Sequence, residues 1–295
     1  MSESIIEVRK LSRRFRKKTA LDDVTLEVRR GEVYGLVGEN GAGKTTLIKH
    51  LLGLFKAQAG SVSVFGLDPV QDPVRVLGRI GYLSESREMP DWMQVGELMK
   101  YTQAFFPRWD EGFAEELRSM FELVKDQKIK SLSRGQRARM GLLLALAHYP
   151  DLLILDEPSS GLDPIVRRDI LAAVIRTVAD EGRTVLFSSH LLDEVERVAD
   201  RFAMLHKGKF VLSDTVDHVL AEHHLLTVRF ESPLDCHPQF DGALGWSGEG
   251  VEWTCVCNGA LEQLRSEVAA VGAAIVEERR PSLEEVFVAR AGDQT

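Results

Sequence analysis

The stretch Gly38–Thr46, GENGAGKTT, decides the fold of this chain. It follows Val33–Val37 (VYGLV), an apolar β-branched run typical of a buried strand, and it precedes TTLIKHLLGLF, where leucines recur at helical spacing. Glycines in such a loop let successive backbone N–H groups point at an anion, and the N-terminus of the following helix adds a positive end. The order strand, glycine loop, helix therefore predicts a phosphate-binding loop rather than an incidental Gly-rich turn.

Two side chains at the end of this loop have the chemistry that a nucleotide needs. Lys44 is expected to reach the outer phosphates, and the Thr45 hydroxyl is expected to ligate Mg²⁺. Kinases, GTPases, helicases and transport motors all carry such a loop. The loop alone therefore predicts a nucleotide site and leaves its purpose open.

The whole sequence of 295 residues is that of an ordinary globular protein, with 44% hydrophobic and 28% charged residues. A net charge of -8 argues against nucleic acid as the main partner. No apolar run approaches the roughly 18 residues that span a bilayer. The charged N-terminus, MSESIIEVRKLSRRF, has no signal-peptide apolar region, so the chain is expected in the cytosol.

Strand-like and helix-like segments alternate along the first 215 residues. Strands are expected at IIEVRK, VTLEV, VYGLV, GSVSVFG, LLILD and TVLFSS, and in a hairpin, RFAMLHKGKFVLS, with its turn at Lys207-Gly208. Helical periodicity is expected from about Asp68 to Ala147, and again in LDPIVRRDILAAVIRTVADEG and LLDEVERVAD. This alternation predicts an α/β fold in which helices cover both faces of a sheet.

Residues 216–295 have a different texture and are expected to form a small accessory α+β domain. Strands are predicted in LLTVRFES, VEWTCVC and AAIVEERR, and helices in ALEQLRSEVAAV and PSLEEVFVARA, the last with a capping box of Ser282 and Glu285. Cys255 and Cys257 share one face of a strand without further ligands nearby, which favours buried packing over a metal pair. No catalytic constellation is evident in this domain.

Two further segments carry candidate chemistry. In LLILDEP, Asp156 ends a strand and can hold Mg²⁺ through water, while Glu157 can polarise an attacking water; the alternative is a pair of helix-capping acids. In SLSRGQRARMGLLLALA, a Ser-x-Gly turn opens an apolar helix and makes a second anion-attracting N-terminus; the alternative is a plain helix cap. One nucleotide does not need both ends, but a phosphate held between two copies of the chain would use both.

Two weaker signals follow these segments: SSGLDP, with Asp163 at a helix start, and TVLFSSH, where His190 ends a buried strand and is by itself more typical of a structural histidine. The motifs GENGAGKT, LSRGQ, LLILDEP, SGLD and SSH stand in the order found in the ATP-binding-cassette (ABC) ATPases. The chain resembles this family over about residues 5–215, and the C-terminal RRPSLEEVFVA is similar to the ending of bacterial export-type cassettes.

The resemblance implies a fold and a set of site residues. The fold is a RecA-like P-loop NTPase core with an antiparallel β subdomain and an inserted helical subdomain, about residues 86–147. Two cassettes would bind two ATP molecules head to tail, with Asp156 on the metal, Glu157 as catalytic base and His190 as γ-phosphate switch. Ser133 and Gly135 would contact the partner's nucleotide, and Asp163 would link the two sites. The remaining nucleotide contacts would come from Phe15 on the adenine and, on the phosphates and Mg²⁺, from Gly38, Asn40, Gly41, Ala42, Gly43, Lys44, Thr45 and Thr46.

Two positions depart from the family pattern. Glu85 stands where the family has glutamine, so it offers oxygen to Mg²⁺ or water but adds negative charge beside the phosphates. Arg134 replaces a glycine in the LSRGQ motif, while the neighbouring Gly135 keeps a bare backbone. Both motifs are expected to remain functional.

The sequence thus predicts the ATP-hydrolysing subunit of a bacterial transporter, made separately from its membrane permease and dimerising on ATP. The loop MPDWMQVGEL, with Trp92 and Met93, is expected to dock the permease or else to fill its own subdomain. The alternatives are a soluble cassette without a membrane partner and a nucleotide-gated module that does not turn over. A single phosphate loop and the lack of long heptads argue against translation-type and repair-type cassettes.

Overall fold

The computed structural model describes residues 3–16, 18–162, 167, 171, 182–238, 240–259 and 261–292. The chain divides into two compact units, Met1–His190 with Leu205–Phe210, and Leu191–Met204 with Val211–Thr295. The domain boundary expected at residue 216 stays a prediction.

A three-stranded antiparallel sheet begins the first unit, in the order β2-β1-β4. Its strands are β1 (Ser4–Phe15), β2 (Lys18–Arg29) and β4 (Ala59–Val64). In β2 the buried Val24, Leu26 and Val28 alternate with more exposed residues, as expected for a strand with one face on a core. The strands predicted from IIEVRK, VTLEV and GSVSVFG are confirmed.

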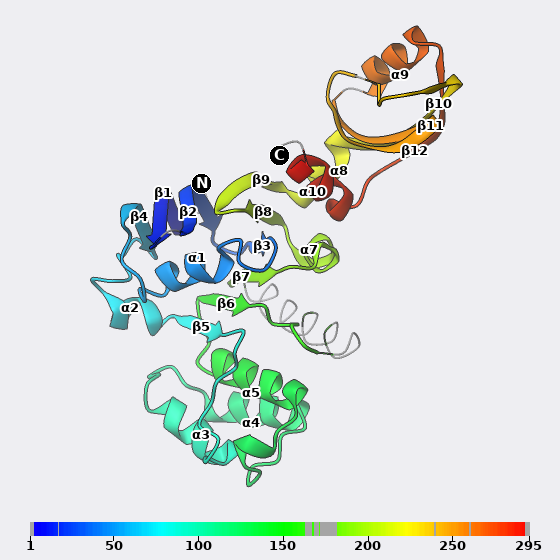
Figure 1. The fold of residues 1–295 in the computed structure, drawn as a ribbon. Coiled ribbons are helices and arrows are strands. Elements are labelled where there is room, and N and C mark those ends of the chain that lie inside the picture. The colour runs from blue at the N-terminus through cyan, green and yellow to red at the C-terminus, as the bar shows by residue number, and fades with distance from the viewer. Residues whose placement is uncertain are drawn as a thin grey trace. The chain divides into compact units, whose positions relative to one another are not determined.

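The central sheet has six strands in the order β5-β6-β7-β3-β8-β9 (Figure 1). They are β5 (Ile80–Leu83), β6 (Leu152–Asp156), β7 (Thr184–Ser189), β3 (Val33–Val37), β8 (Arg201–His206) and β9 (Lys209–Thr215). β5, β6, β7 and β3 pair in parallel, and every residue of β3, β6 and β7 is buried. Their carboxyl ends therefore meet at one edge of the sheet, where α/β proteins bind ligands.

One strand corrects the sequence-based expectation. The region from Asp68 to Ala147 is not helical throughout, because IGYL forms β5 and pairs with β6 from Ile80 to Leu83. IGYL is a short apolar run, which suits a buried strand at the edge of the sheet. The helical periodicity of the residues around it hides this signal in the sequence.

Helix α1 (Lys44–Leu51) follows the glycine loop and packs against β2, β4 and β6, between the two sheets. Leu47, Ile48 and Leu51 are fully buried there. The loop is thus fixed by a strand on one side and by a buried helix on the other. The predicted coverage of both sheet faces involves residues 163–181, most of which lie outside the described residues.

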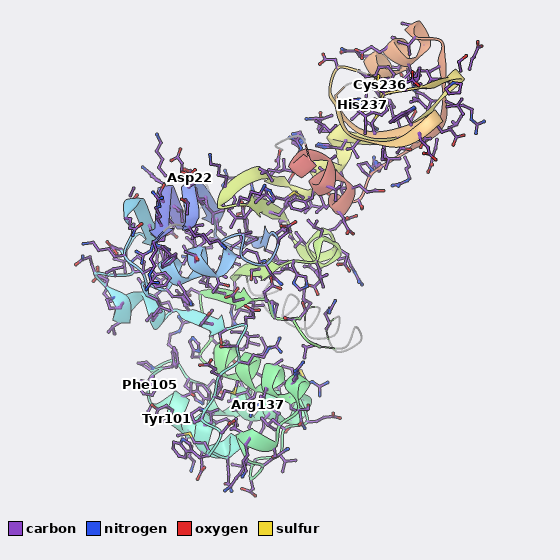
Figure 2. All side chains as sticks on the ribbon, viewed as in Figure 1. Asp22, Tyr101, Phe105, Arg137, Cys236 and His237 are labelled. Atoms are coloured by element: carbon purple, nitrogen blue, oxygen red, sulfur yellow. The ribbon has the colours of Figure 1, made fainter. Side chains whose placement is uncertain are left out.

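The short helix α2 (Pro73–Leu77) precedes β5. The inserted helical segment after β5 consists of α3 (Val95–Gln103), α4 (Glu111–Met120), the 3₁₀ turn η1 (Ile129–Ser131) and α5 (Arg134–Leu146). α5 packs on β5, and α3 and α4 pack on α5. Of the two residues expected to dock a partner or fill the core, Trp92 is 70% exposed and Met93 is buried. Tyr101 on α3 and Phe105 just after that helix are also exposed, and their rings pack edge against face (Figure 2).

The predicted β8–β9 hairpin turns at Lys207 and Gly208, both with positive φ. The helix α7 (Leu192–Val198) lies within LLDEVERVAD as expected. The helix expected in LDPIVRRDILAAVIRTVADEG, including Asp163, falls largely outside the described residues. No described helix is both long and apolar enough to cross a bilayer.

The second unit holds a three-stranded antiparallel sheet in the order β11-β10-β12. Its elements are α8 (Val216–Glu222), β10 (His223–Leu234), β11 (Ala243–Asn258), α9 (Leu261–Ala270), β12 (Ala273–Arg279) and α10 (Leu283–Gly292). The predicted packing of the cysteines is confirmed, because Cys255 and Cys257 are buried in a cluster with Leu226 and Leu264. Among the described residues no group of three or more His, Cys, Asp or Glu could hold a metal ion.

The capping box predicted at the start of α10 is also present. Ser282 N donates to Glu285 Oε2 at 2.8 Å, and Glu285 N donates to Ser282 Oγ at 3.3 Å. The last predicted helix of the chain therefore begins where its sequence places the cap.

Candidate functional site

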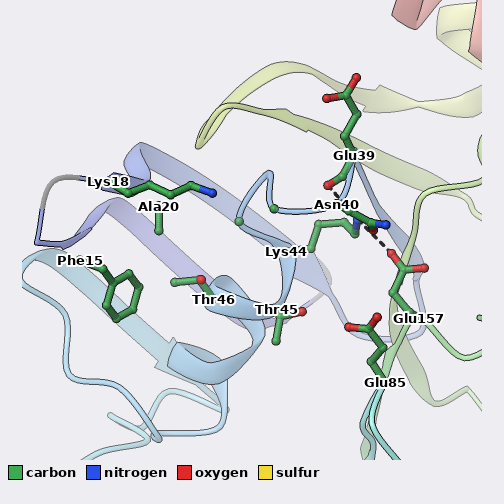
Figure 3. Close-up of a pocket in the computed structure, with 12 residues that line it drawn as sticks. Phe15, Lys18, Ala20, Glu39, Asn40, Lys44, Thr45, Thr46, Glu85 and Glu157 are labelled. Atoms are coloured by element: carbon green, nitrogen blue, oxygen red, sulfur yellow. Dashed lines mark hydrogen bonds and ion pairs between the residues drawn. The ribbon is translucent and has the colours of Figure 1, made fainter.

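A pocket of about 490 Å³ opens beside the glycine loop and the end of β6 (Figure 3). Its walls come from the end of β1, the start of β2, the glycine loop, α1 and the loops after β5 and β6. The lining residues are Phe15, Lys18, Ala20, Glu39, Asn40, Gly41, Gly43, Lys44, Thr45, Thr46, Glu85 and Glu157. All except Lys18, Ala20 and Glu39 were predicted from the sequence.

Two glycines of the loop lie where a side chain does not fit. A Cβ on Gly38 would stand 2.2 Å from the carbonyl oxygen of Leu205, and one on Gly43 would stand 2.4 Å from that of Ala20. Gly43 also has a φ of 121°, which L side chains rarely adopt. The loop therefore approaches two neighbouring strands as closely as a bare backbone allows. Ala42, which was predicted with these glycines, is buried in the same loop and its N–H donates to Glu39 O.

Lys44 is buried in the pocket wall and surrounded by acceptors. Its Nζ lies 2.9 Å from Glu157 Oε1, and it donates to Gly38 O at 2.5 Å and to Glu39 O at 3.3 Å. The side chains of Lys44 and Glu157 are only 5% and 4% exposed. The ammonium thus lies at the position from which it can bind an anion entering the loop.

Hydrogen bonds to one serine connect the two acids after β6. Ser188 Oγ donates to Asp156 Oδ1 at 2.7 Å and accepts from Glu157 N at 2.9 Å. Thr45 Oγ1 donates to the same Asp156 oxygen at 3.3 Å. Burial raises the pKa of Asp156, and the bonds from Ser188 and Thr45 act against that rise.

His190 follows β7 and contacts the second acid. Its Nδ1 lies 2.7 Å from Glu157 Oε2. A carboxylate only accepts hydrogen bonds, so this contact places a proton on Nδ1. Glu157 therefore bridges His190 and Lys44, so the structure brings these three residues together, and their roles stay a prediction.

Ser133 and Gly135 do not line this pocket. They lie instead in a separate pocket of about 310 Å³ with Arg134, Gly161 and Leu162 among its walls. Ser133 is the N-cap of α5: its Oγ accepts from Gln136 N at 3.2 Å and its own N–H donates to Gln136 Oε1 at 3.0 Å. Asp163, the next predicted site residue, lies outside the described residues.

Comparisons with known proteins identify the family of the chain. The sequence profile of the ABC transporter family matches residues 21–160. The chain is 31% identical over 286 residues to an uncharacterized ABC transporter ATP-binding protein of Synechocystis, covering 92% of this chain and 78% of that protein. The chain belongs to the ABC transporter family. Its place in the family is that of the ATP-binding subunit, and its enzymatic activity is that of an ATPase.

Other members extend the similarity along the chain. YtrB, an ABC transporter ATP-binding protein of Bacillus subtilis, is 27% identical over 288 residues. The aligned region covers 98% of this chain and 98% of YtrB. The bacitracin transport ATP-binding protein BcrA of Bacillus licheniformis is 30% identical over 247 residues, which cover 79% of this chain and 81% of BcrA. The solved structure of an ATP-binding subunit of an ABC transporter superposes on this chain with a TM-score of 0.67 and 29% sequence identity. The superposed region covers 74% of this chain and 92% of that subunit.

The donor set of this ABC subunit fits a divalent cation. The Thr45 hydroxyl and the buried Asp156 carboxylate are in contact at the pocket, and the Glu85 carboxylate lines the same pocket from the loop after β5. Oxygen ligands of this kind suit Mg²⁺. The three predicted metal residues therefore have the oxygen donors that Mg²⁺ prefers, and two of them, Thr45 and Asp156, are in direct contact.

Phe15 lies at the opposite end of the pocket from Glu157. Its ring is 39% exposed, with its centroid 5.6 Å from that of Phe55 and the Arg13 guanidinium carbon 4.7 Å over it. The aromatic face thus stands at the pocket wall, as predicted for a residue that stacks on adenine. Lys18, which also lines the pocket, was not predicted as a site residue. The basic run RKK directly after Phe15 could have indicated it.

Proposed function

We propose that this chain powers an exporter made of separate subunits. ATP binding closes two copies of the ATPase head to tail, hydrolysis reopens them, and the motion passes to a membrane permease. Similarity to BcrA, which is named for bacitracin transport, favours export among the possible directions. The site geometry supports a cycle in which binding and hydrolysis are separate steps.

Within the pocket, the proposed roles follow from the contacts. Lys44, Thr45 and Thr46, with backbone N–H groups of Asn40–Gly43, bind the phosphates. Glu157 accepts a proton from the attacking water, and His190 contacts the γ-phosphate region from the end of β7. Lys44 exchanges its ion pair with Glu157 for the phosphates, which leaves the carboxylate available as a base.

Thr45, Asp156 and Glu85 are the residues that would hold Mg²⁺. The bound ion supplies positive charge against the β- and γ-phosphates. Asp156 is already oriented for this role by its bonds to Thr45 and Ser188.

The observation that carries the dimer proposal is that the chain has two anion-binding features in two different pockets. The glycine loop lines one pocket, and the Ser133 cap of α5 lines another. A helix N-terminus with free N–H groups attracts a phosphate, but Ser133 does not line the pocket of its own chain's loop. Head-to-tail pairing lets Ser133 and Gly135 of one subunit meet the nucleotide of the other, with Asp163 between the sites.

The membrane partner is proposed to dock on the inserted helical segment, which places the chain at the inner face of the cell membrane through its permease. Trp92 is exposed on the loop after β5, Tyr101 is exposed on α3 and Phe105 is exposed just after α3. Exposed aromatic side chains are enriched at protein interfaces.

A Glu157→Gln variant tests this proposal. We expect it to bind ATP and to form dimers in analytical ultracentrifugation, while its turnover falls by about a hundredfold or more, the usual contribution of a general base. Glu27→Gln, at an exposed glutamate of β2, is the control and keeps full turnover. Unchanged hydrolysis in Glu157→Gln would contradict the role of Glu157 as general base. A monomer with ATP bound would contradict the proposed dimer.

The permease is tested separately. Affinity-tagged chain is expected to recover integral membrane subunits from detergent-solubilised membranes of its source organism, and vesicles containing them should hydrolyse ATP faster with the transported compound. Recovery from the soluble fraction alone would instead support a cassette that has no membrane partner.

A further inference from the structure

Arg87 is a buried arginine on the loop after β5, two residues beyond Glu85, and only 8% of its surface is exposed. Its Nη2 donates to three backbone carbonyl oxygens: Pro158 O at 2.9 Å, Ser160 O at 2.9 Å and Glu157 O at 3.4 Å. All three belong to the loop that follows β6. One guanidinium therefore fixes the backbone from the carbonyl group of the residue proposed as catalytic base through the three residues after it.

The backbone at Glu157 has to be held in place by its surroundings, because Glu157 has a φ of 49°. The left-handed region is unfavourable for a residue with a Cβ, and such conformations persist only where the surroundings hold them. Two further bonds hold this residue: its N–H donates to Ser188 Oγ at 2.9 Å, and its carbonyl oxygen also accepts from Ser160 N at 3.1 Å. Arg87 supplies the remaining bonds from a different part of the chain.

The charge of Arg87 is directed at this loop rather than at a carboxylate. No ion pair to Arg87 is present among the described residues, and its buried Nε has no hydrogen-bond partner there. Burial lowers the pKa of Arg87, Glu85 opposes that change and Arg134 adds to it, but a guanidinium remains protonated at physiological pH. Burying a cation is costly, so the hydrogen bonds from Nη2 to the three carbonyl oxygens are the interaction that retains it.

We propose that Arg87 is a positioning residue for ATP hydrolysis, which holds the Glu157 peptide so that its carboxylate stays between Lys44 and His190. The inference rests on the proposed role of Glu157 as the base. Because Arg87 shares a loop with Glu85, it also makes the position of the catalytic carboxylate depend on the segment that leads into the helical subdomain.

Replacement of Arg87 by methionine, which has a similar length and no charge, is the first test. A displaced base slows the chemical step, so kcat should fall by about tenfold to a hundredfold, while the KM for ATP and the affinity for a fluorescent ATP analogue change less than about threefold. Arg87→Lys keeps the charge but not the planar fork, and should recover only part of the rate. Added guanidinium ion should partly rescue Arg87→Ala.

Arg137 gives a matched control. It lies in the same arginine-lined pocket as Arg87, but its guanidinium pairs with Asp91 at 2.6 Å, and within the described residues it has no bond to the loop after β6. Arg137→Met should therefore keep kcat within about twofold. Equal losses of kcat in the two variants, or a loss of ATP affinity that matches the loss of kcat in Arg87→Met, would overturn the inference.

A double variant separates this inference from the proposed function. If Arg87 acts through Glu157, then Arg87→Met changes the residual turnover of Glu157→Gln by less than about twofold, because coupled residues are not additive. Additive losses in the double variant would overturn it. If Glu157→Gln loses turnover and folded Arg87→Met keeps it, only the inference fails; if Glu157→Gln keeps turnover, the base assignment itself fails. Should Arg87→Met not fold, Arg87→Lys answers the same question.

Discussion

Lys44 and Glu157 form a buried ion pair across the nucleotide pocket, with Nζ and Oε1 2.9 Å apart. The same carboxylate contacts His190 through its other oxygen at 2.7 Å. The residue proposed to bind phosphate and the residue proposed to activate water thus neutralise each other in this structure. ATP binding has to separate them, so nucleotide affinity and the stability of the pair oppose each other.

The first prediction concerns that opposition. Lys44→Met leaves a buried carboxylate with His190 alone, and should lower the free energy of unfolding by about 1–3 kcal/mol, less than for a fully closed pair because the pocket admits water. Adding Glu157→Gln should recover about half of this loss. Chemical denaturation of the nucleotide-free protein measures both, with Lys49→Met on the same helix as control. Additive losses would show that the pair is not energetically coupled.

The second prediction compares two glycines of the same loop. A Cβ on Gly43 meets the Ala20 carbonyl oxygen at 2.4 Å, whereas a Cβ on Gly41 meets only the flexible end of Lys18, at 3.4 Å. Both have positive φ, so both alanine variants carry backbone strain of about 1 kcal/mol or more. Gly43→Ala should weaken ATP binding by about thirtyfold or more and Gly41→Ala by less than about tenfold, measured by titration. Equal losses would contradict the close approach of the loop to Ala20.

The third prediction separates the two roles of Ser133. Ser133→Ala removes the N-cap of α5 and should cost about 1 kcal/mol of stability. Ser133→Asp keeps a good cap but puts a negative charge where the partner's phosphate is proposed to bind. In a Glu157→Gln background, sedimentation should show that Ser133→Asp stays monomeric with ATP although it is as stable as its parent. ATP-driven dimers of Ser133→Asp would exclude Ser133 from the interface.

The fourth prediction is a pH dependence at His148. This ring is 1% exposed and stacked on Phe106, and burial lowers its pKa from 6.5 to about 4. The unfolded chain therefore binds a proton below about pH 6.5 that the folded chain takes up only near pH 4, so stability falls as the pH drops through this window. Between about pH 7.5 and about pH 5 this group accounts for about 2 kcal/mol.

His148→Gln should remove this part of the pH dependence, because glutamine keeps an N–H for the bond to Ile80 O and has no titrating proton. Urea unfolding at the two pH values measures it, and His218→Gln, at an exposed histidine, is the control. An unchanged pH dependence in His148→Gln would contradict the assignment.

The parts of the site that the sequence predicted are those that lie within a few residues of a strand end. The glycine loop follows VYGLV, Asp156 and Glu157 follow LLIL, and His190 follows TVLFSS. Buried strands of this kind are recognisable from their composition, and they pair in parallel. Because parallel strands have their carboxyl ends at the same edge of a sheet, composition alone is enough to predict that these residues lie together.

The parts that it did not predict depend on pairings between distant segments. β5 is only four residues long and is a strand because β6 lies beside it. Trp92 and Met93 are adjacent and equally apolar in type, yet only Met93 is buried, and its carbonyl oxygen accepts a hydrogen bond from Ile129 N of η1. The carbonyl contacts of Arg87 have no local signal at all, because backbone oxygens carry no sequence identity.

Ser188, whose hydroxyl group joins Asp156 and Glu157, also connects these acids to the central sheet. It lies on β7, which is locked between β6 and β3 along its whole length and which leads within two residues to His190. A single interior strand therefore sets the alignment of Asp156, Glu157 and His190, the proposed metal ligand, base and switch, at once. Substitutions that shift this strand would displace all three side chains together. Substitutions in the loops around the sheet can therefore change the ATPase rate with less disruption than substitutions within it.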